Sequence, residues 1–499
     1  MFSLLNKNTI PSDDKNDSNS HTFMLDLNID QILDSMLIEW DPEIKKMFES
    51  FPDSKEDEDY RRDIYCDIKN DDVYSCLMDY HAAIRERNSF AGRMDNAYEL
   101  IQKQTWYLRM IYTYISSLEM LKDKLSKCSL KSEGLKSLYS YLDSFLSDSS
   151  TKSLHDSCFE LWKELSDFHV ILSYEKGRFT ITNGKTGSEY EKFLDELFPG
   201  EKHSMTSPFE GTEYFSDLED EIIKLFQKKN KNYFKKLEKF CKVYSSVSDE
   251  QIVLFEKEIC YYLAFEGFRR RMELHGYGMC TPLSGGDELS ADGLYDLALA
   301  ISNIERGKET VPNELFLGKD ERFFVLTGPN QGGKTTYGRS LGQLIYFTKM
   351  GFDVPASNAK VPHYTNLWTH FSVEESIESG RGKLMDELER LKPIMHDSQE
   401  GSFVVINELF TTAANFDAIE MGKRVLDTLI SKNCKGIYVT HLGELADSKK
   451  GVVSLIATVD KENVQTFLIE RSAPIETESV NRQVLKYSLT YDRLKERFK

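Results

Sequence analysis

The sequence predicts a multidomain protein in which a mainly α-helical region, residues 23–282, precedes an α/β domain, residues 283–499. From about Met24 to Met272, apolar residues recur with helical periodicity and proline is rare, which suits long helices. Around Thr281 to Gly293 the composition shifts to Gly, Ser, Pro and Asp, which marks a domain boundary. Beyond it, strand-like and helical runs alternate, as in a domain with a parallel sheet.

Length, charge and cysteine spacing limit the number of domains, the kind of nucleic-acid binding and the cellular compartment that we expect. A chain of 499 residues is too long for one ordinary domain. The net charge of −19 disfavours a broad, non-specific electrostatic grip on nucleic acid and leaves a local basic patch open. The eight cysteines are scattered without metal-ligand spacing, so we expect free thiols in a reducing cytoplasm. We find no signal peptide and no apolar run long enough to span a bilayer.

Residues 1–22 are expected to form a flexible tail. It begins with a short apolar hook, Phe2–Leu5, and continues as a polar tract of Asn, Asp, Ser and Lys. Docking of the hook and disorder of the whole tail both remain open.

The helical region has two interruptions and one basic segment. Phe179–Gly184 has the character of a strand followed by a turn, and Pro199–Thr212 that of a loop. The segment Lys228–Lys239 interleaves lysines with Tyr233 and Phe234. Such a pattern can contact DNA phosphates, but a solvated helix face is the more frequent origin of it.

A glycine-rich loop organises the α/β domain. The apolar run Phe323–Leu326 has the length of a buried strand, and residues 328–335 fit the phosphate-loop pattern G-x-x-x-x-G-K-[ST], with a helix expected after it. Glycines let backbone N–H groups surround a phosphate chain, Lys334 can reach the β- and γ-phosphates, and the Thr335 hydroxyl can bind Mg²⁺. We therefore predict that ATP and Mg²⁺ are bound, with nucleotide contacts from Gly328, Pro329, Asn330, Gln331, Gly332, Gly333, Lys334, Thr335 and Thr336.

A second strand supplies the acidic partner of this loop. Phe403–Ile406 reads as a buried strand, and Asn407 and Glu408 follow it. The usual pair is Asp then Glu, where the Asp holds Mg²⁺ and the Glu orients or deprotonates the attacking water. Asn407 can still serve the metal through a bound water but brings no negative charge, so we expect intact ATP binding with weaker Mg²⁺ affinity or slower turnover. Glu408 keeps the position of the base.

A third strand is predicted over Gly436–His441. His441 at its end is placed to contact the γ-phosphate or its water. A lone histidine at the end of a strand is more often structural than catalytic, so both roles stay open.

Together these elements resemble the MutS family of DNA mismatch-repair ATPases, which is of the ABC type. The loop T-G-P-N-Q-G-G-K-T-T is similar to that family's T-G-P-N-M-G-G-K-S-T. Gly351–Ala356 and Val311–Leu315 resemble its G-x-x-V-P-A and V-P-N-D segments, and Thr440–His441 matches its T-H. Tyr487–Lys495 is similar to its closing helical segment.

The chain departs from the family pattern at two segments. Ser379–Leu388 lies where the family has S-T-F-M-x-E-M, so Gly382 replaces the Ser that reaches the partner subunit's γ-phosphate, while Glu387 is kept. Residues 407–417 lack the Gly-Arg-Gly core of D-E-x-G-R-G-T-S-T-x-D but keep Asp417. The chain also looks too short for the family's N-terminal mismatch-recognition and connector domains.

The resemblance implies an ATP-dependent DNA-binding homodimer. Residues 23–282 would form a core and lever domain, and residues 283–499 an ABC-type ATPase domain with a C-terminal helical segment. ATP hydrolysis at the dimer interface would move the levers that grip mismatched or branched DNA. Glu408 and His441 are then the catalytic candidates, and Thr335 and Asn407 the metal candidates.

Two alternatives remain. The protein could be a nucleotide-gated scaffold with little turnover and no DNA affinity, which the net charge and Asn407 favour. A transporter ATPase is the other, and nothing in the sequence supports it.

Overall fold

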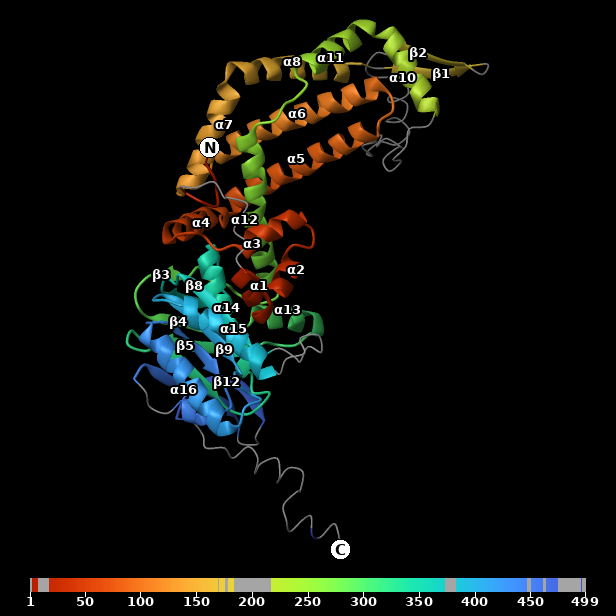
Figure 1. The fold of residues 1–499 in the computed structure, drawn as a ribbon. Coiled ribbons are helices and arrows are strands. Elements are labelled where there is room, and N and C mark those ends of the chain that lie inside the picture. Colours follow the sequence, from red (N-terminus) through yellow and green to blue (C-terminus); the bar gives the residue numbers. More distant parts are fainter. Residues whose placement is uncertain are drawn as a thin grey trace. The chain divides into compact units, whose positions relative to one another are not determined.

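The computed structural model describes residues 2–7, 18–168, 170–175, 178–183, 217–372, 383–446, 450–460, 464–473 and 495. A helical N-terminal part is followed by an α/β part, as the sequence predicts (Figure 1). No helix among these residues is long and apolar enough to cross a bilayer.

The chain divides into two compact units. One contains Met1–Lys69, Lys131–Gly134 and Lys257–Lys499, and the other contains Asn70–Leu130 and Leu135–Glu256. The predicted limits of the domains near residues 23 and 283 stay a prediction. The predicted loop at residues 199–212 and most of the closing segment at 487–495 lie outside the described residues.

The second unit is helical and carries one hairpin. Its elements are α5 (Asp71–Asn96), α6 (Leu100–Leu125), α7 (Glu133–Ser147), α8 (Ser149–Ser166), β1 (Val170–Glu175), β2 (Arg178–Asn183), α10 (Asp217–Lys229), α11 (Lys231–Val243) and the first turns of α12 (Glu250–Leu274). The strands β1 and β2 pair in antiparallel fashion, with Val170 opposite Asn183, so a strand does precede the predicted turn.

The basic segment of this unit is broken by Asn230, where α10 ends and α11 begins. Tyr233 and Phe234 are 2% and 8% exposed, so both aromatic rings belong to the core of the unit. Lys235 and Lys236 are exposed. The two buried rings are therefore unable to stack on DNA bases, while contact of the exposed lysines with DNA phosphates and a solvated helix face both stay open.

The first unit begins with short helices and continues as the α/β part. Its elements are α1 (Ser18–Asp26), α2 (Ile29–Met36), the 3-10 turn η1 (Pro42–Ile44), α3 (Lys45–Glu49), α4 (Lys55–Ile68), the rest of α12, β3 (Leu283–Ser284), β4 (Leu289–Leu294), α13 (Leu297–Arg306), β5 (Asn313–Leu317), β6 (Phe323–Thr327), α14 (Lys334–Met350), β7 (Asn358–Val361), β8 (Asn366–Phe371), α15 (Lys383–Asp397), β9 (Ser402–Asn407), α16 (Asn415–Ser431), β10 (Lys435–Val439), η2 (Gly443–Leu445), β11 (Val452–Val459) and β12 (Gln465–Arg471).

The N-terminal hook, Phe2–Leu5, is docked against helices α4 and α12. Leu4 and Leu5 are buried, and the carboxylate of Glu258 on α12 accepts hydrogen bonds from the Ser3 hydroxyl (2.5 Å) and the Leu4 N–H (2.6 Å). Arg61 on α4 donates to the Leu5 carbonyl at 2.7 Å. Residues 2–7 are thus held against two helices, while the flexible tail predicted for residues 1–22 as a whole stays a prediction.

The main sheet of the α/β part has six strands in the order β12-β11-β6-β10-β9-β8. All neighbours are parallel except β11 and β12. All five residues of β6 are buried, and so are all six of β9, which confirms the two buried strands read from the sequence. The parallel arrangement places the carboxyl ends of β6, β9, β10 and β8 at one edge.

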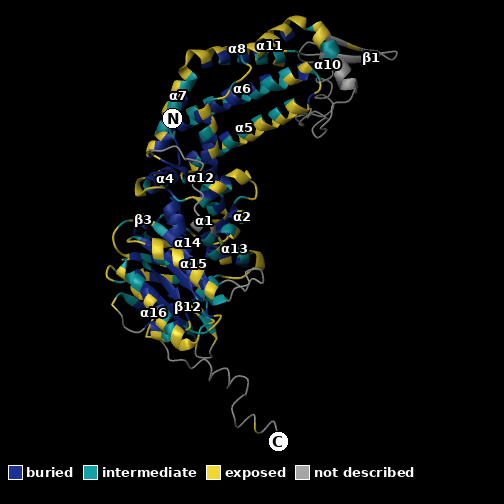
Figure 2. Cartoon of the chain, viewed as in Figure 1, coloured by how far each residue is buried: buried dark blue, intermediate teal, exposed yellow. Residues whose placement is uncertain are grey.

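A second sheet of four strands, in the order β3-β7-β4-β5, was not predicted. Helix α14 is buried around almost its whole circumference, including Leu341, Leu344 and Ile345, and is the central helix of the unit (Figure 2). Gly342 permits this packing, because a Cβ atom there would lie 2.3 Å from a methyl group of Leu27.

Gly351 and Gly307 provide a matched test of the close approach between α14 and α4. Both glycines end a helix with positive φ, 85° and 62°. A Cβ at Gly351 would lie 2.8 Å from Arg61 Cβ and 2.9 Å from Arg62 N, whereas a Cβ at Gly307 meets nothing within 4 Å. We expect Gly307→Ala to cost about 1–2 kcal/mol and Gly351→Ala about 1–3 kcal/mol more. Urea unfolding of both variants near neutral pH measures this, and equal losses would contradict the close approach.

The docked hook predicts a pH dependence. Burial raises the pKa of Glu258 from 4.5 to about 6, although Ser3, Leu4 and Arg61 partly offset it. Between these values the folded state keeps a proton that the unfolded state has lost. The stability of the wild type should therefore fall by about 2 kcal/mol, relative to Glu258→Gln, as the pH rises from 4.5 through 6. Urea unfolding of both proteins across this pH range measures the effect. A constant difference between their free energies of unfolding would contradict the raised pKa of Glu258.

Candidate functional site

The predicted phosphate loop connects β6 to α14 at the carboxyl edge of the main sheet. Gly328, Gln331 and Gly333 have positive φ values of 126°, 64° and 85°. A Cβ at Gly328 would lie 3.0 Å from the backbone N of Ala457 on β11, and one at Gly332 would lie 3.0 Å from the Pro329 carbonyl oxygen. The loop therefore needs glycine both for its backbone angles and for its close packing.

Lys334, at the start of α14, is folded onto this loop. Its Nζ donates to the carbonyl oxygens of Gly328 (2.9 Å) and Pro329 (3.0 Å). The residue is 5% exposed, and burial lowers the pKa of its ammonium group while Glu408 partly restores it. Because the hydrogen-bond partners of this buried ammonium group are carbonyl oxygens, binding of an anion beside it is favourable.

Thr335 and Asn407 meet across the ends of α14 and β9. The Thr335 hydroxyl donates to Asn407 Oδ1 at 3.1 Å, and Asn407 is 7% exposed. The two oxygens are hard ligands of the kind that Mg²⁺ prefers. No group of three or more His, Cys, Asp or Glu side chains suited to a metal lies in the described part of the chain. A metal here would therefore take its remaining ligands from water and from a bound phosphate.

Glu408 and His441 follow neighbouring strands but differ in their surroundings. Glu408 has a φ of 50°, and its N–H donates to the Val439 carbonyl at 2.9 Å. Its side chain lines the cavity described below. His441 lies two residues beyond the end of β10, is exposed, and does not line this cavity.

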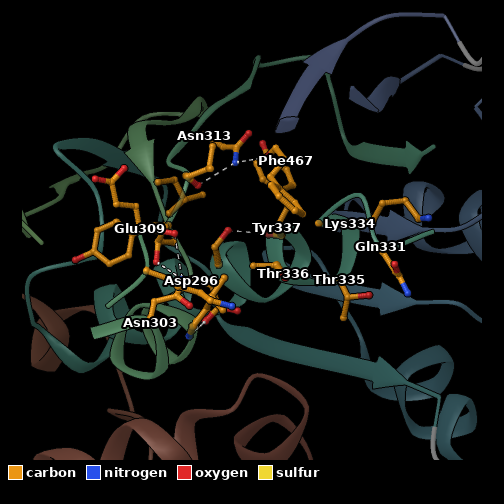
Figure 3. A pocket seen from close by; sticks show the side chains of 18 of the residues that line it. Asp296, Asn303, Glu309, Asn313, Gln331, Lys334, Thr335, Thr336, Tyr337 and Phe467 are labelled. Carbon is orange, nitrogen blue, oxygen red and sulfur yellow. Dashed lines mark hydrogen bonds between the residues drawn. The ribbon is translucent and has the colours of Figure 1, made fainter. Parts of the chain in front are cut away.

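A cavity of about 680 Å³ lies beside the loop (Figure 3). Seven of the residues predicted from the sequence line it, namely Asn330, Gln331, Gly333, Lys334, Thr335, Thr336 and Glu408. Five others do not, namely Gly328, Pro329, Gly332, Asn407 and His441. The volume lies within the range of small-molecule sites.

The far wall of the cavity comes from segments that the sequence analysis did not place at the site. Asp296 caps the start of α13, where its carboxylate accepts from the N–H groups of Ala298 and Leu299. Phe467 on β12 is 45% exposed with a φ of 59°, and its carbonyl accepts from the Asn313 side chain at 3.1 Å. Asn313 belongs to the V-P-N segment, which was the one signal in the sequence for this wall.

The two segments that depart from the family pattern are described only in part. Gly382 and residues 373–381 lie outside the described residues. Glu387 on α15 is 4% exposed, and Asp417 is exposed in the first turn of α16.

Comparison with known proteins gives one family model, MutS domain V, which matches residues 324–483. The DNA mismatch repair protein MutS of Fervidobacterium nodosum is 31% identical over 144 residues, which is 29% of this chain and 18% of that protein. MutS of Pseudothermotoga lettingae is 30% identical over 173 residues, 34% of this chain and 21% of that protein. MutS 1 of Haloarcula marismortui is 31% identical over 143 residues, 28% of this chain and 16% of that protein.

The match covers about a fifth of the length of these curated relatives. The family-model match begins inside β6 and includes the glycine-rich loop, α14, Asn407 and Glu408.

Proposed function

We propose that this chain binds and hydrolyses ATP and couples this reaction to DNA, because its residues 324–483 match the family model of MutS domain V. The proposal rests above all on the meeting of three parts at one edge of the parallel sheet. These are the glycine-rich loop with Lys334, the Thr335–Asn407 pair, and Glu408 beside the cavity. In open α/β sheets, ligands bind at this edge.

We assign the phosphate end of the nucleotide to the loop. The Lys334 ammonium would exchange its two carbonyl partners for phosphate oxygens, and the N-terminus of α14 would add its dipole. The base would lie toward Phe467, whose exposed ring offers an apolar face, while Asn313 fixes the backbone of that strand.

Thr335 and Asn407 are the residues that would hold Mg²⁺, since their oxygens already lie 3.1 Å apart. The ion would neutralise charge on the phosphates. Glu408 is the proposed base, because its carboxylate lines the cavity beside Lys334. His441 is proposed as a sensor of the γ-phosphate, a role that requires it to approach the cavity when ATP binds.

The finer assignments follow the family. We propose a homodimer with two ATP sites, a core and lever domain at residues 23–282, an ATPase domain at residues 283–499, and a preference for mismatched or branched DNA. The relatives are named DNA mismatch repair proteins.

The second candidate function is a nucleotide-gated scaffold with little turnover. Its support is the neutral side chain at Asn407 and the net charge of −19. Glu408 at the cavity favours turnover instead.

Asn407→Asp should strengthen the use of Mg²⁺. The carboxylate would add a negative charge beside the Thr335 hydroxyl, so the Mg²⁺ concentration for half-maximal ATP hydrolysis should fall by about 10- to 100-fold. Asn366→Asp is the control, because it adds the same charge at the first residue of β8, at the opposite edge of the sheet. Unchanged Mg²⁺ dependence in Asn407→Asp would place the metal elsewhere.

The coupling to DNA is tested by steady-state ATP hydrolysis with Mg²⁺, without DNA and with matched, mismatched or four-way-junction DNA. We expect stimulation by mismatched or junction DNA. Glu408→Gln should lower the rate by about 10²- to 10⁴-fold while it still binds ATP. ATP binding without turnover and without any response to DNA would favour the scaffold, and absence of ATP binding would reject the site.

A further inference from the structure

The turn after β9 has an uncommon backbone. Glu408 and Phe410 have φ values of 50° and 64°, so two of three consecutive non-glycine residues are left-handed. Side chains with a Cβ rarely adopt this region, and it persists only where the surrounding structure holds it. Strain of this kind gathers at functional sites. The base proposed above therefore lies in a turn that other contacts must hold.

Three groups of contacts hold the turn. The side chains of Leu409 and Phe410 are each 2% exposed and belong to the core beneath the sheet. The Glu408 N–H donates to the Val439 carbonyl at 2.9 Å. The Phe410 N–H donates to Glu387 Oε2 at 3.1 Å. The last contact is the one side-chain hydrogen bond to the backbone of the turn among those described.

Glu387 is itself fixed in position. It lies in the first turns of α15, and its backbone carbonyl is 3.1 Å from Nε2 of His370 on β8. Burial lowers the pKa of His370 to about 4, so the ring is neutral near pH 7, and we assign the proton to Nε2, facing the carbonyl. One turn along, Arg390 donates to the Phe371 carbonyl at 2.6 Å and to the carboxylate of Asp26. Helix α15 is thus tied to β8 at Glu387 itself and one turn after it.

We propose that Glu387 is a positioning residue for ATP hydrolysis, because its carboxylate accepts the Phe410 N–H and so holds the strained turn that presents Glu408 to the cavity. Glu387 does not line the cavity, so it acts through the turn and not on the nucleotide. This inference rests on the function proposed above. It assigns a role to Glu387, which the chain keeps although Gly382 in the same segment departs from the family pattern.

The position of the acceptor oxygen, more than its charge, should decide the effect. Gln has the length of Glu and keeps an oxygen that can accept the Phe410 N–H, whereas Asp keeps the charge but is one methylene shorter. Displacement of a reacting group by about 1 Å costs about 100-fold in rate. Glu387→Gln should therefore retain more activity than Glu387→Asp. A residue kept only for its charge would give the opposite order.

The test is steady-state ATP hydrolysis by the full chain carrying Glu387→Gln, Glu387→Asp or Glu387→Ala, with ATP affinity measured separately and thermal unfolding recorded. We expect kcat to fall about 10- to 100-fold in Glu387→Asp and Glu387→Ala, with ATP affinity nearly unchanged and with most of the rate recovered in Glu387→Gln. Glu389→Ala, an exposed position on the same helix, should behave as the wild type.

Two results would overturn the inference. One is wild-type kcat in all Glu387 variants. The other is a loss of kcat, ATP affinity and thermal midpoint together, with Glu387→Gln no better than Glu387→Asp. If Glu387→Ala fails to fold, the order of the Gln and Asp variants still decides. A wild-type protein without ATP turnover would instead reject the proposed function on which the inference rests.

Discussion

The parallel alignment of β6, β9 and β10 is the constraint on which the rest of the site depends. Because these strands run in one direction, the residues that follow them emerge at the same edge, although they are far apart in the sequence. The phosphate loop follows β6, and Asn407 and Glu408 lie at the end of β9. The hydrogen bond from Thr335 to Asn407 is the local result of that alignment. A shift of one residue in the register would separate these groups.

Helix α14 links this edge to the N-terminal helices of the same unit. Lys349 in its last turn is 3% exposed in its side chain and pairs with Glu58 of α4 at 2.7 Å, while His363 approaches the other oxygen of Glu58 at 2.9 Å. At the end of α4, Lys69 pairs with the fully buried Asp353 at 2.7 Å. Removing one partner from such a pair costs about 3–5 kcal/mol. These contacts, with the close approach at Gly351, hold α14 and α4 together within this unit.

Cavity residues that belong to a local sequence pattern could be predicted. Cavity residues that only the tertiary fold brings there could not. Lys334 and Thr335 belong to a contiguous pattern, and Glu408 follows a recognisable buried strand. Phe467 carries no such signal, since only the pairing of β12 with β11 and its bonds to Asn313 bring it to the cavity. The role of His441 stays a prediction, because its side chain is exposed and does not line the cavity. The hook at Leu4 was undecided in the sequence, since nothing local shows that Glu258 lies ready to accept its backbone.

The neutral residue at Asn407 is best understood together with its burial. An Asp at a position that is 7% exposed would carry an uncompensated charge whenever no metal is bound, apart from the hydroxyl of Thr335. Asn keeps the hydrogen bond to Thr335 without that cost. Glu408 then supplies the negative charge at the site, and it already raises the pKa of Lys334 against the lowering caused by burial. The turn that carries Glu408 is strained and tightly held, which suits a carboxylate that lies at the cavity and interacts with the buried Lys334.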